Sequence, residues 1–389
     1  MFPRQNKVNE DYLLDIKKPI LKVIGLGGGG CNAIERMIEN NLRGIQFIAA
    51  NTDDQVLRNN HAPVKIQLGP NYTRGLGAGG DPKIGRAAAE ESRWEISEAL
   101  AGADMVFLTA GMGGGTGTGA IPVVAEIARE QGSAVIAIVT TPFSFEMGRR
   151  QRNAREGLEL LREHTHTLAT IPNDRLLYVA PRNLPMEVAF RLADDVLRQA
   201  VQGISEIIYE PGLINVDFAH VQRLIRLGGG ALMAIGQGSG NRKVQQALEQ
   251  ALHHPLLDDF SLENAAGIIA NFTGGDDLCL SDIEYALSHL NAQAGSQTEI
   301  VMGVIQNPTM KDRLQVTLMV TGLGASTLEE TMKKVQYSSK EPIQVNLPKP
   351  IEETVHMKCI PGNKVDSLVL NNNLDIPAFL RKRSRLITV

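Results

Sequence analysis

The residues with the most suggestive chemistry lie between Gly113 and Gly119, where the chain reads Gly-Gly-Gly-Thr-Gly-Thr-Gly. Glycines lack the Cβ atoms that would keep backbone N–H groups from converging on an anion. The pattern from Ala120 to Glu130 predicts a helix, whose start would add the positive end of its dipole. A flexible linker is the alternative, but linkers are not expected between a buried strand and a helix. The predicted phosphate cradle comprises Gly113, Gly114, Gly115, Thr116, Gly117 and Thr118.

A second glycine-rich turn, Gly25-Leu-Gly-Gly-Gly-Gly30, ends an apolar strand pattern at residues 20–25. It matches G-x-G-x-x-G, and the acidic Asp53 follows the next apolar run, so a nicotinamide-linked dehydrogenase is one interpretation. A third glycine-rich loop occupies residues 73–82. Three such loops on one edge would surround a polyphosphate, so a nucleoside triphosphate fits better than a dinucleotide. The G-x-x-x-x-G-K-[ST] pattern of P-loop enzymes does not occur in the sequence.

These turns need a scaffold that brings them to one edge. Apolar strand patterns at 20–25, 45–50, 104–110 and 134–140 alternate with helical patterns, one of them from Gly85 to Leu100. This alternation predicts an α/β fold built on a doubly wound parallel sheet. Ligands in such sheets bind beyond the carboxyl ends of the strands, where the glycine loops would converge.

A long helix is predicted from Met186 to Glu210, with apolar positions on more than one stripe, as expected for a helix packed on two sides. Phe190 and Asp194 are four residues apart and therefore share a face. An aromatic plane beside a carboxylate that accepts from N1–H and the exocyclic amine is what guanine requires. Asp195 is the alternate acceptor. An equally good interpretation places Phe190 in the core and makes both aspartates charges that favour a helix start.

The chain beyond this helix predicts a second, smaller α/β unit. Strands are predicted at 231–237, 267–272, 299–305 and 314–321, with helices near 243–253 and 280–290. Residues 324–373 have too little apolar clustering to form a core and predict a disordered linker. Residues 374–389 combine apolar side chains with a basic tail, which predicts a docking peptide that orders on binding. A merely solubilising end would not explain Ile376, Phe379 and Leu380.

We therefore expect six segments along the chain. They are a flexible segment 1–18, a nucleotide-binding domain 19–186, a central helix 187–210, a C-terminal domain 211–323, the linker 324–373 and the tail 374–389.

The composition is ordinary for a soluble globular protein, since 43% of the 389 residues are apolar and 21% are charged. A formal net charge of −4 provides no field for nucleic acid. The apolar runs are far shorter than the ~20 residues of a membrane helix, and the first residues lack a signal core, so a cytoplasmic protein is expected. Cys31, Cys279 and Cys359 are widely spaced and indicate neither disulfides nor a zinc site.

Several segments together resemble the FtsZ family, the bacterial cell-division GTPases related to tubulin. The resemblance covers residues 20–323 and resumes at the terminal peptide, and its most specific motif is the glycine run 113–119. The other matching segments, in the family's order, are Ile24–Asn32, Ala50–Asp53, Ile171–Asp174, Asn215–Ala219 and Asp375–Leu380. The resemblance implies a tubulin-like fold, GTP or GDP as the ligand, and Mg²⁺ as its companion.

The resemblance also assigns residues to this site by position. It places Gly28, Gly29, Gly30, Cys31, Asn32 and the cradle residues on the phosphates, with Asp53 near them through Mg²⁺. It places Glu146 and Arg150 near the ribose, includes Asn173, and agrees that Phe190 and Asp194 bind guanine.

In this family, subunits stack head to tail, and the loop that begins at Asn215 enters the nucleotide site of the next subunit. Asp217 would orient the attacking water there. The family usually has a second Asp where this chain has His220, which cannot offer the same pair of acceptor oxygens. We therefore expect slower hydrolysis and longer-lived filaments, unless His220 acts as a base.

The leading interpretation is a cytoplasmic GTPase that polymerises into protofilaments at the mid-cell division site. Its terminal peptide would bind membrane-tethering division proteins through Asp375, Ile376, Pro377, Phe379, Leu380 and Arg381. The first alternative is a slow or non-hydrolysing GTP-binding scaffold, and the second is the dehydrogenase, which leaves the glycine run 113–119 without a role.

Overall fold

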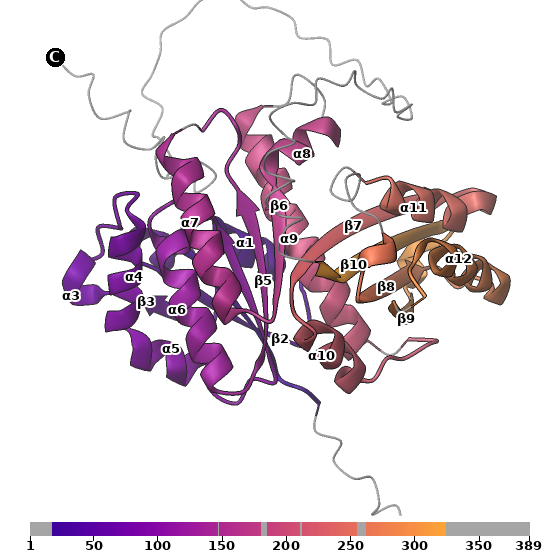
Figure 1. Ribbon diagram of the computed structural model, residues 1–389, viewed down its shortest axis with the longest axis horizontal. Helices are drawn as coiled ribbons and strands as arrows, with labels where there is room; N and C mark the ends of the chain where they lie inside the picture. Colours follow the sequence, from indigo (N-terminus) through magenta and orange to yellow (C-terminus); the bar gives the residue numbers. More distant parts are fainter. Residues whose placement is uncertain are drawn as a thin grey trace, which may run out of the picture.

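The computed structural model describes residues 18–146, 148–179, 185–210, 212–254, 262–296 and 298–323. The predicted linker 324–373, the docking peptide and nearly all of segment 1–18 lie outside these residues. The described chain forms one ten-stranded sheet in the order β3-β2-β1-β4-β5-β6-β7-β10-β8-β9, with helices on both faces (Figure 1). The α/β architecture expected from the sequence is confirmed.

The first part of the sheet is parallel and runs from β3 to β6. Its strands are β1 (Leu21–Leu26), β2 (Ile45–Asn51), β3 (Val64–Gln67), β4 (Met105–Gly111), β5 (Ala134–Thr141) and β6 (Thr167–Pro172). Its helices are α1 (Gly27–Glu39), α2 (Asp54–Asn59), α3 (Pro70–Thr73), α4 (Pro82–Glu91), α5 (Arg93–Leu100), α6 (Thr116–Glu130), α7 (Arg149–His164) and α8 (Asn173–Val179). All of β1 and β5 is buried, because helices cover both faces and these strands are almost entirely apolar.

Two apolar cores lie on opposite faces of this sheet. One packs α1 and the central helix against the strands through residues such as Ile34 and Leu197. The other packs α4 to α7 against them through residues such as Ile96, Ile121 and Leu158. The glycine turns are therefore attached to a sheet that is packed on both faces.

The prediction of a single helix from Gly85 to Leu100 is wrong. The chain breaks at Ser92 into α4 and α5. Ser92 Oγ accepts a hydrogen bond from the Gly69 N–H at 3.1 Å and donates to the Gln67 carbonyl at 3.2 Å. The backbone at Ser92 departs from helical geometry, with φ −97° and ψ 22°, and its side chain ties the junction of the two helices to residues 67–69, a contact that apolar periodicity does not reveal.

The predicted central helix is confirmed as α9 (Met186–Tyr209). Its 24 residues span about 36 Å at the standard rise. One side packs on α1, and the other meets the second half of the chain, where a Cβ atom at Gly203 would lie 2.6 Å from the Thr317 side chain. Packing on two sides explains why its apolar residues exceed a single stripe.

The second half continues the same sheet. Its elements are α10 (Phe218–Arg226), β7 (Gly230–Ser239), η2 (Gly240–Arg242), α11 (Lys243–Leu252), η3 (Leu262–Asn264), β8 (Gly267–Gly274), α12 (Leu280–Gln293), β9 (Glu299–Gln306), η4 (Pro308–Met310) and β10 (Arg313–Leu323). All four predicted strands are present, each extended by one to three residues. Strand β10 runs antiparallel to both β7 and β8, so the complete sheet is mixed rather than parallel.

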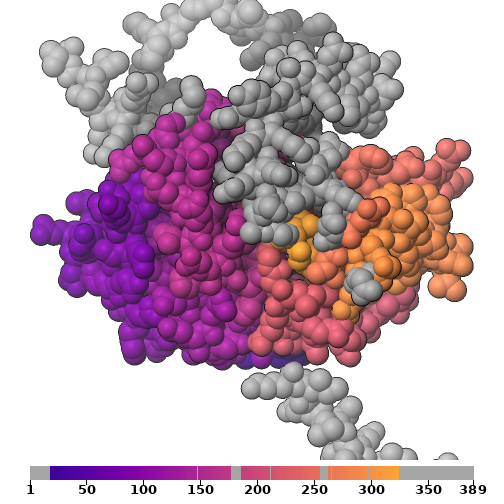
Figure 2. Space-filling view, viewed as in Figure 1, coloured from indigo at the N-terminus to yellow at the C-terminus, as the bar shows by residue number. Residues whose placement is uncertain are grey.

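The two halves lie directly against each other (Figure 2). Their sheets join through only two residue pairs of β6 and β7, Leu168 with Gly230 and Ala169 with Ala231. The domain boundaries expected from the sequence remain a prediction.

Candidate functional site: a glycine-lined rim at the carboxyl ends of the strands

The two main glycine turns lie against each other. They follow the paired strands β1 and β4, where Leu26 is opposite Ala110. A Cβ atom at Gly27, whose φ is +69°, would lie 2.8 Å from the backbone nitrogen of Gly117, and one at Gly29 would lie 3.1 Å from that of Gly111. The starts of α1 and α6 are thus side by side, and both direct unpaired N–H groups and a positive dipole end to the same rim.

The glycines of these turns divide into two groups. A Cβ atom at Gly28 or Gly114 would meet no atom of the described residues within 4 Å, so both border open space. A Cβ atom at Gly30 would lie 2.4 Å from the Thr109 carbonyl oxygen, and one at Gly115 would lie 2.8 Å from the Ala78 Cβ atom. The first pair leaves room for an anion, whereas the second pair permits close packing of the backbone.

The two threonines of the cradle also differ in their contacts. The Thr118 hydroxyl oxygen accepts a hydrogen bond from the Gly113 N–H at 2.8 Å and so stabilises the turn itself. The Thr116 hydroxyl lies 2.6 Å from the hydroxyl of Thr52, a buried residue at the end of β2 that the sequence analysis did not single out.

Asp53, Asn32 and Cys31, which the sequence assigns to the phosphate site, differ in burial and in their contacts. Asp53 caps α2, because its Oδ1 accepts from the N–H groups of Gln55 at 2.9 Å and Val56 at 3.4 Å. Asn32 is exposed on α1. Cys31 is fully buried, and burial raises the pKa of its thiol to about 12. Any contact of Cys31 with a nucleotide would therefore involve its backbone and not its side chain.

The start of α7 approaches the cradle. A Cβ atom at Gly113 would lie 2.7 Å from the Arg150 carbonyl oxygen. Arg150 forms an ion pair with Glu146, whose Oε1 also accepts from the Phe143 N–H at 3.1 Å. Asn153, which sequence reasoning missed, donates to the carbonyls of Gly80 at 3.2 Å and Gly113 at 3.4 Å. It joins the third glycine loop to the cradle, which supports the expected convergence of the loops.

An aromatic group lies near the start of α9. The rings of Phe143 and Phe190 are edge to face with centroids 5.4 Å apart, and Phe145 stacks on Phe143 at 5.0 Å. Phe143 is buried, whereas 54% of Phe145 is exposed. Phe145 is a further aromatic surface that the sequence analysis did not consider.

Asp194 has an unexpected partner. Arg36 of α1 donates from Nε to its Oδ2 at 3.4 Å, and only 13% of the Asp194 side chain is exposed. Burial raises the pKa of this carboxyl to about 7, and Arg36 opposes that shift. Asp195 instead pairs with Arg198 at 2.6 Å and is 38% exposed. Since 158 positions separate Arg36 from Asp194, no local pattern could have indicated the pair.

Asn173 lies at the start of α8, directly after β6, and is 5% exposed. Among the described residues its Oδ1 has no hydrogen-bond partner. A buried amide oxygen without a partner costs stability, and a ligand that donates to it would remove that cost.

Three of the predicted site residues lie at the opposite ends of the strands from the glycine turns. Asn215, Asp217 and His220 are exposed around the start of α10. Side chains of α10 bond to backbone just ahead of β4 and β5, from Gln222 to Asp104 at 3.5 Å and from Arg226 to Gly132 at 2.9 Å. These are the amino ends of the strands, so α10 and α8 lie at opposite ends of the fold (Figure 1).

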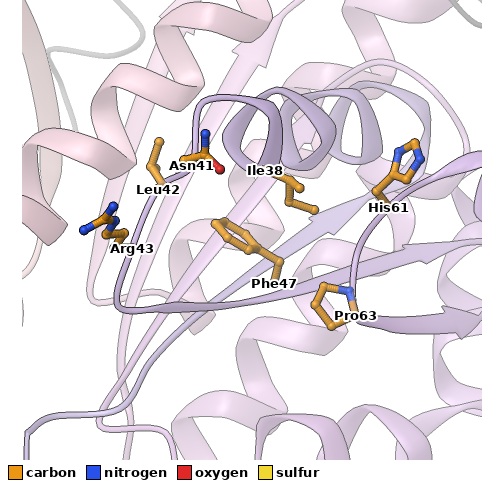
Figure 3. Close-up of a pocket in the computed structure, with 7 residues that line it drawn as sticks. All are labelled: Ile38, Asn41, Leu42, Arg43, Phe47, His61 and Pro63. Atoms are coloured by element: carbon orange, nitrogen blue, oxygen red, sulfur yellow. The ribbon is translucent and has the colours of Figure 1, made fainter.

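A cavity of about 510 Å³ lies at the far end of α1, away from the glycine turns. Phe47, Ile38 and Leu42 line it together with the polar side chains of Arg43 and His61 (Figure 3). A second cavity, of about 420 Å³, lies between the end of α9 and the second half of the chain. Neither cavity is lined by a predicted nucleotide-binding residue.

Across the described parts of the chain, no group of three or more His, Cys, Asp or Glu side chains is placed to hold a metal ion. Of the helices that the structure describes, none is long and apolar enough to cross a lipid bilayer.

Comparisons with known proteins agree with this arrangement. Residues 20–181 match the tubulin/FtsZ family GTPase domain, and residues 229–324 match the C-terminal domain of the FtsZ family. The cell division protein FtsZ of Pseudomonas aeruginosa is 44% identical over 94% of this chain and 97% of its own length. The FtsZ of Pseudomonas putida is 41% identical over 95% of this chain and 98% of its own.

Solved structures give the same result. An empty FtsZ dimer from M. jannaschii superimposes with a TM-score of 0.76 at 42% identity, over 79% of this chain and 90% of that one. GDP-bound CetZ1 from Haloferax volcanii, at 19% identity, shares the fold with a TM-score of 0.69 over 82% of this chain and 99% of that one. Because the family domains and the relatives cover nearly the whole described chain, this protein belongs to the tubulin/FtsZ family.

Proposed function

We propose that this chain is a GTPase of the bacterial cell-division cytoskeleton that polymerises head to tail and completes its active site between subunits. The observation that carries the proposal is the separation of two half-sites. The glycine-lined rim lies at the carboxyl ends of the strands, and the loop with Asp217 lies at the amino ends.

Helix α9 sets the distance between these half-sites. It begins beside the aromatic group at the rim and ends, about 36 Å away, just before the loop with Asp217. A carboxylate cannot span that distance to reach its own rim. Asp217 can act only on the nucleotide of another copy, and a contact between two different surfaces produces an open filament.

The chemistry required of the rim is positioning and charge stabilisation. The N–H groups at the starts of α1 and α6 would hold the phosphates, with Gly28 and Gly114 leaving the space for them. Asp217 of the next subunit would orient the attacking water. Mg²⁺ typically binds phosphate oxygens with one or two carboxylates, and Asp53 beside the cradle suits that role. The ion would neutralise charge on the phosphates.

Guanine recognition is assigned to Phe190 and Asp194, with Asp195 as the alternate acceptor. A carboxyl must be ionised to accept from both N1–H and the exocyclic amine. Burial works against ionisation of Asp194, and the Arg36 guanidinium favours it. We therefore add Arg36 to the proposed base site as the group that favours the charged form of the acceptor. The pair of Glu146 with Arg150 is assigned to the ribose, and Asn173 to the nucleotide.

A slow or non-hydrolysing scaffold is the second candidate, because His220 stands one turn after Asp217 at the proposed catalytic edge. Family membership removes the reason for the dehydrogenase interpretation. The proposal also includes assembly at mid-cell and the binding of membrane-tethering proteins by Asp375–Arg381. Pull-down of such proteins, with a tail-deleted chain as the control, would test that binding.

The central test mixes two inactive variants. Asp217→Ala should bind GTP but lose turnover, and Gly28→Ala should keep Asp217 but bind GTP too weakly for turnover at a GTP concentration below the wild-type KM. If the active site is shared, an equimolar mixture regains phosphate release, because Asp217 of one variant can meet GTP held by the other. The control is Asp217→Ala mixed with the doubly substituted chain, which should stay inactive. Full turnover by Asp217→Ala alone would place catalysis elsewhere.

A further inference from the structure

Thr52 occupies a junction of three segments of the rim. Its carbonyl accepts from the Gly77 N–H at 3.1 Å, which joins it to the third glycine loop. Its hydroxyl lies 2.6 Å from that of Thr116, the first residue of α6. Thr52 itself directly follows β2 and precedes Asp53.

The burial of the two threonines decides the direction of their hydrogen bond. Each hydroxyl has one hydrogen to donate, and a single hydrogen lies between two oxygens at this distance. Thr52 is 0% exposed, so its hydrogen must be donated within the protein, and the Thr116 oxygen is the acceptor that the structure provides. Thr116 is partly exposed and can donate its own hydrogen outward.

We propose that Thr52 is a positioning residue for the cradle, whose buried hydroxyl donates to Thr116 Oγ1 and thereby turns the Thr116 hydrogen toward the bound phosphate. This inference rests on the proposed GTP-binding function. The phosphate receives a preoriented donor, and no rotamer freedom of Thr116 has to be lost on binding. The same contact ties the position of β2, and so of Asp53, to the start of α6.

The test is Thr52→Val, which has nearly the same shape but cannot donate. We expect the KM for GTP to rise about three- to tenfold, the range of one neutral hydrogen bond, because Thr116 loses its fixed orientation but can still donate to the phosphate. Thr52→Ser keeps the hydroxyl and should remain within about twofold of wild type. The matched control is Thr109→Val in β4, because Thr109 is also fully buried but its Oγ1 has no partner among the described residues. It should leave the KM unchanged.

A double-mutant cycle with Thr116→Val separates positioning from a general effect on folding. If Thr52 acts through Thr116, the double variant binds GTP no more weakly than Thr116→Val alone. Additive losses, or a Thr52→Val protein with the wild-type KM, would overturn the proposal. Thermal unfolding of each variant is measured alongside, and a loss of affinity that Thr52→Ser does not rescue also counts against it. A wild-type chain that fails to bind GTP would refute the proposed function instead.

Discussion

Two neighbouring glycines of the first turn should respond oppositely to the same added methyl group. Gly28→Ala places the methyl in the open space of the rim, with no atom of the described residues within 4 Å. Gly28 lies in the first turn of α1 and does not have a positive φ, so alanine fits its backbone. Gly30→Ala places the methyl 2.4 Å from the Thr109 carbonyl oxygen and 2.8 Å from the backbone of Gly25.

The expected magnitudes follow from these contacts. Alanine at position 28 should raise the free energy of unfolding by about 0.4–1 kcal/mol, the usual effect of replacing glycine where alanine fits the native backbone. It should weaken GTP binding at least tenfold, because excluding a phosphate from even one N–H group removes a charge-assisted bond of about 1.5–3 kcal/mol. Alanine at position 30 should cost about 1–3 kcal/mol or more in unfolding free energy, since the atoms it meets belong to packed backbone.

The assay is urea unfolding of the nucleotide-free proteins together with equilibrium binding of GTP. Gly28→Ala should unfold at or above the wild-type midpoint yet bind poorly, and Gly30→Ala should unfold at a lower midpoint. If Gly28→Ala binds GTP as the wild type does, the open space beside Gly28 does not hold the phosphates, and the assignment of the rim is wrong.

Three other variants test separate parts of the molecule. His220→Asp should hydrolyse GTP faster than the wild type, and unchanged phosphate release during normal polymerisation would contradict the expected role of this position. The pKa of Asp194 is raised to about 7 from an ordinary 3.8. The contribution of this carboxyl to the free energy of unfolding is therefore most favourable below pH 4 and is lost as the pH rises through 7. Asp194→Asn should remove that decline, which chemical unfolding at pH 5 and pH 8 would detect as a difference of a few kcal/mol at most. Lys22 is 7% exposed and donates to the carbonyls of Ala99 at 2.8 Å and Ala101 at 2.9 Å. Lys22→Met should therefore cost about 1–3 kcal/mol of unfolding free energy, measured in urea with the exposed Lys83→Met as the control.

The parts of the fold that follow from local patterns could be predicted from the sequence. Continuous apolar runs specified the buried strands, and the two-sided periodicity of 186–210 specified α9. The cradle was evident because five glycines in seven residues serve few other purposes. Its convergence with the other loops follows from the shared carboxyl ends of parallel strands.

The features that sequence reasoning missed depend on contacts between distant segments. Ser92, at the junction of α4 and α5, bonds to Gly69 and Gln67, and Asn153 joins two loops that lie far from it in the chain. The Arg36–Asp194 pair forms only because α1 and α9 pack together. The reversal of β10 was likewise hidden, because apolar periodicity does not encode strand direction.

The length of α9 has a consequence for how filaments age. Under the proposed function, a free subunit cannot cleave the nucleotide that it carries, so this protein hydrolyses GTP only where subunits have already joined. In every filament the terminal subunit with an uncovered glycine rim keeps its triphosphate, whereas interior subunits do not. The two filament ends therefore differ chemically, and loss of subunits should begin wherever diphosphate first becomes exposed.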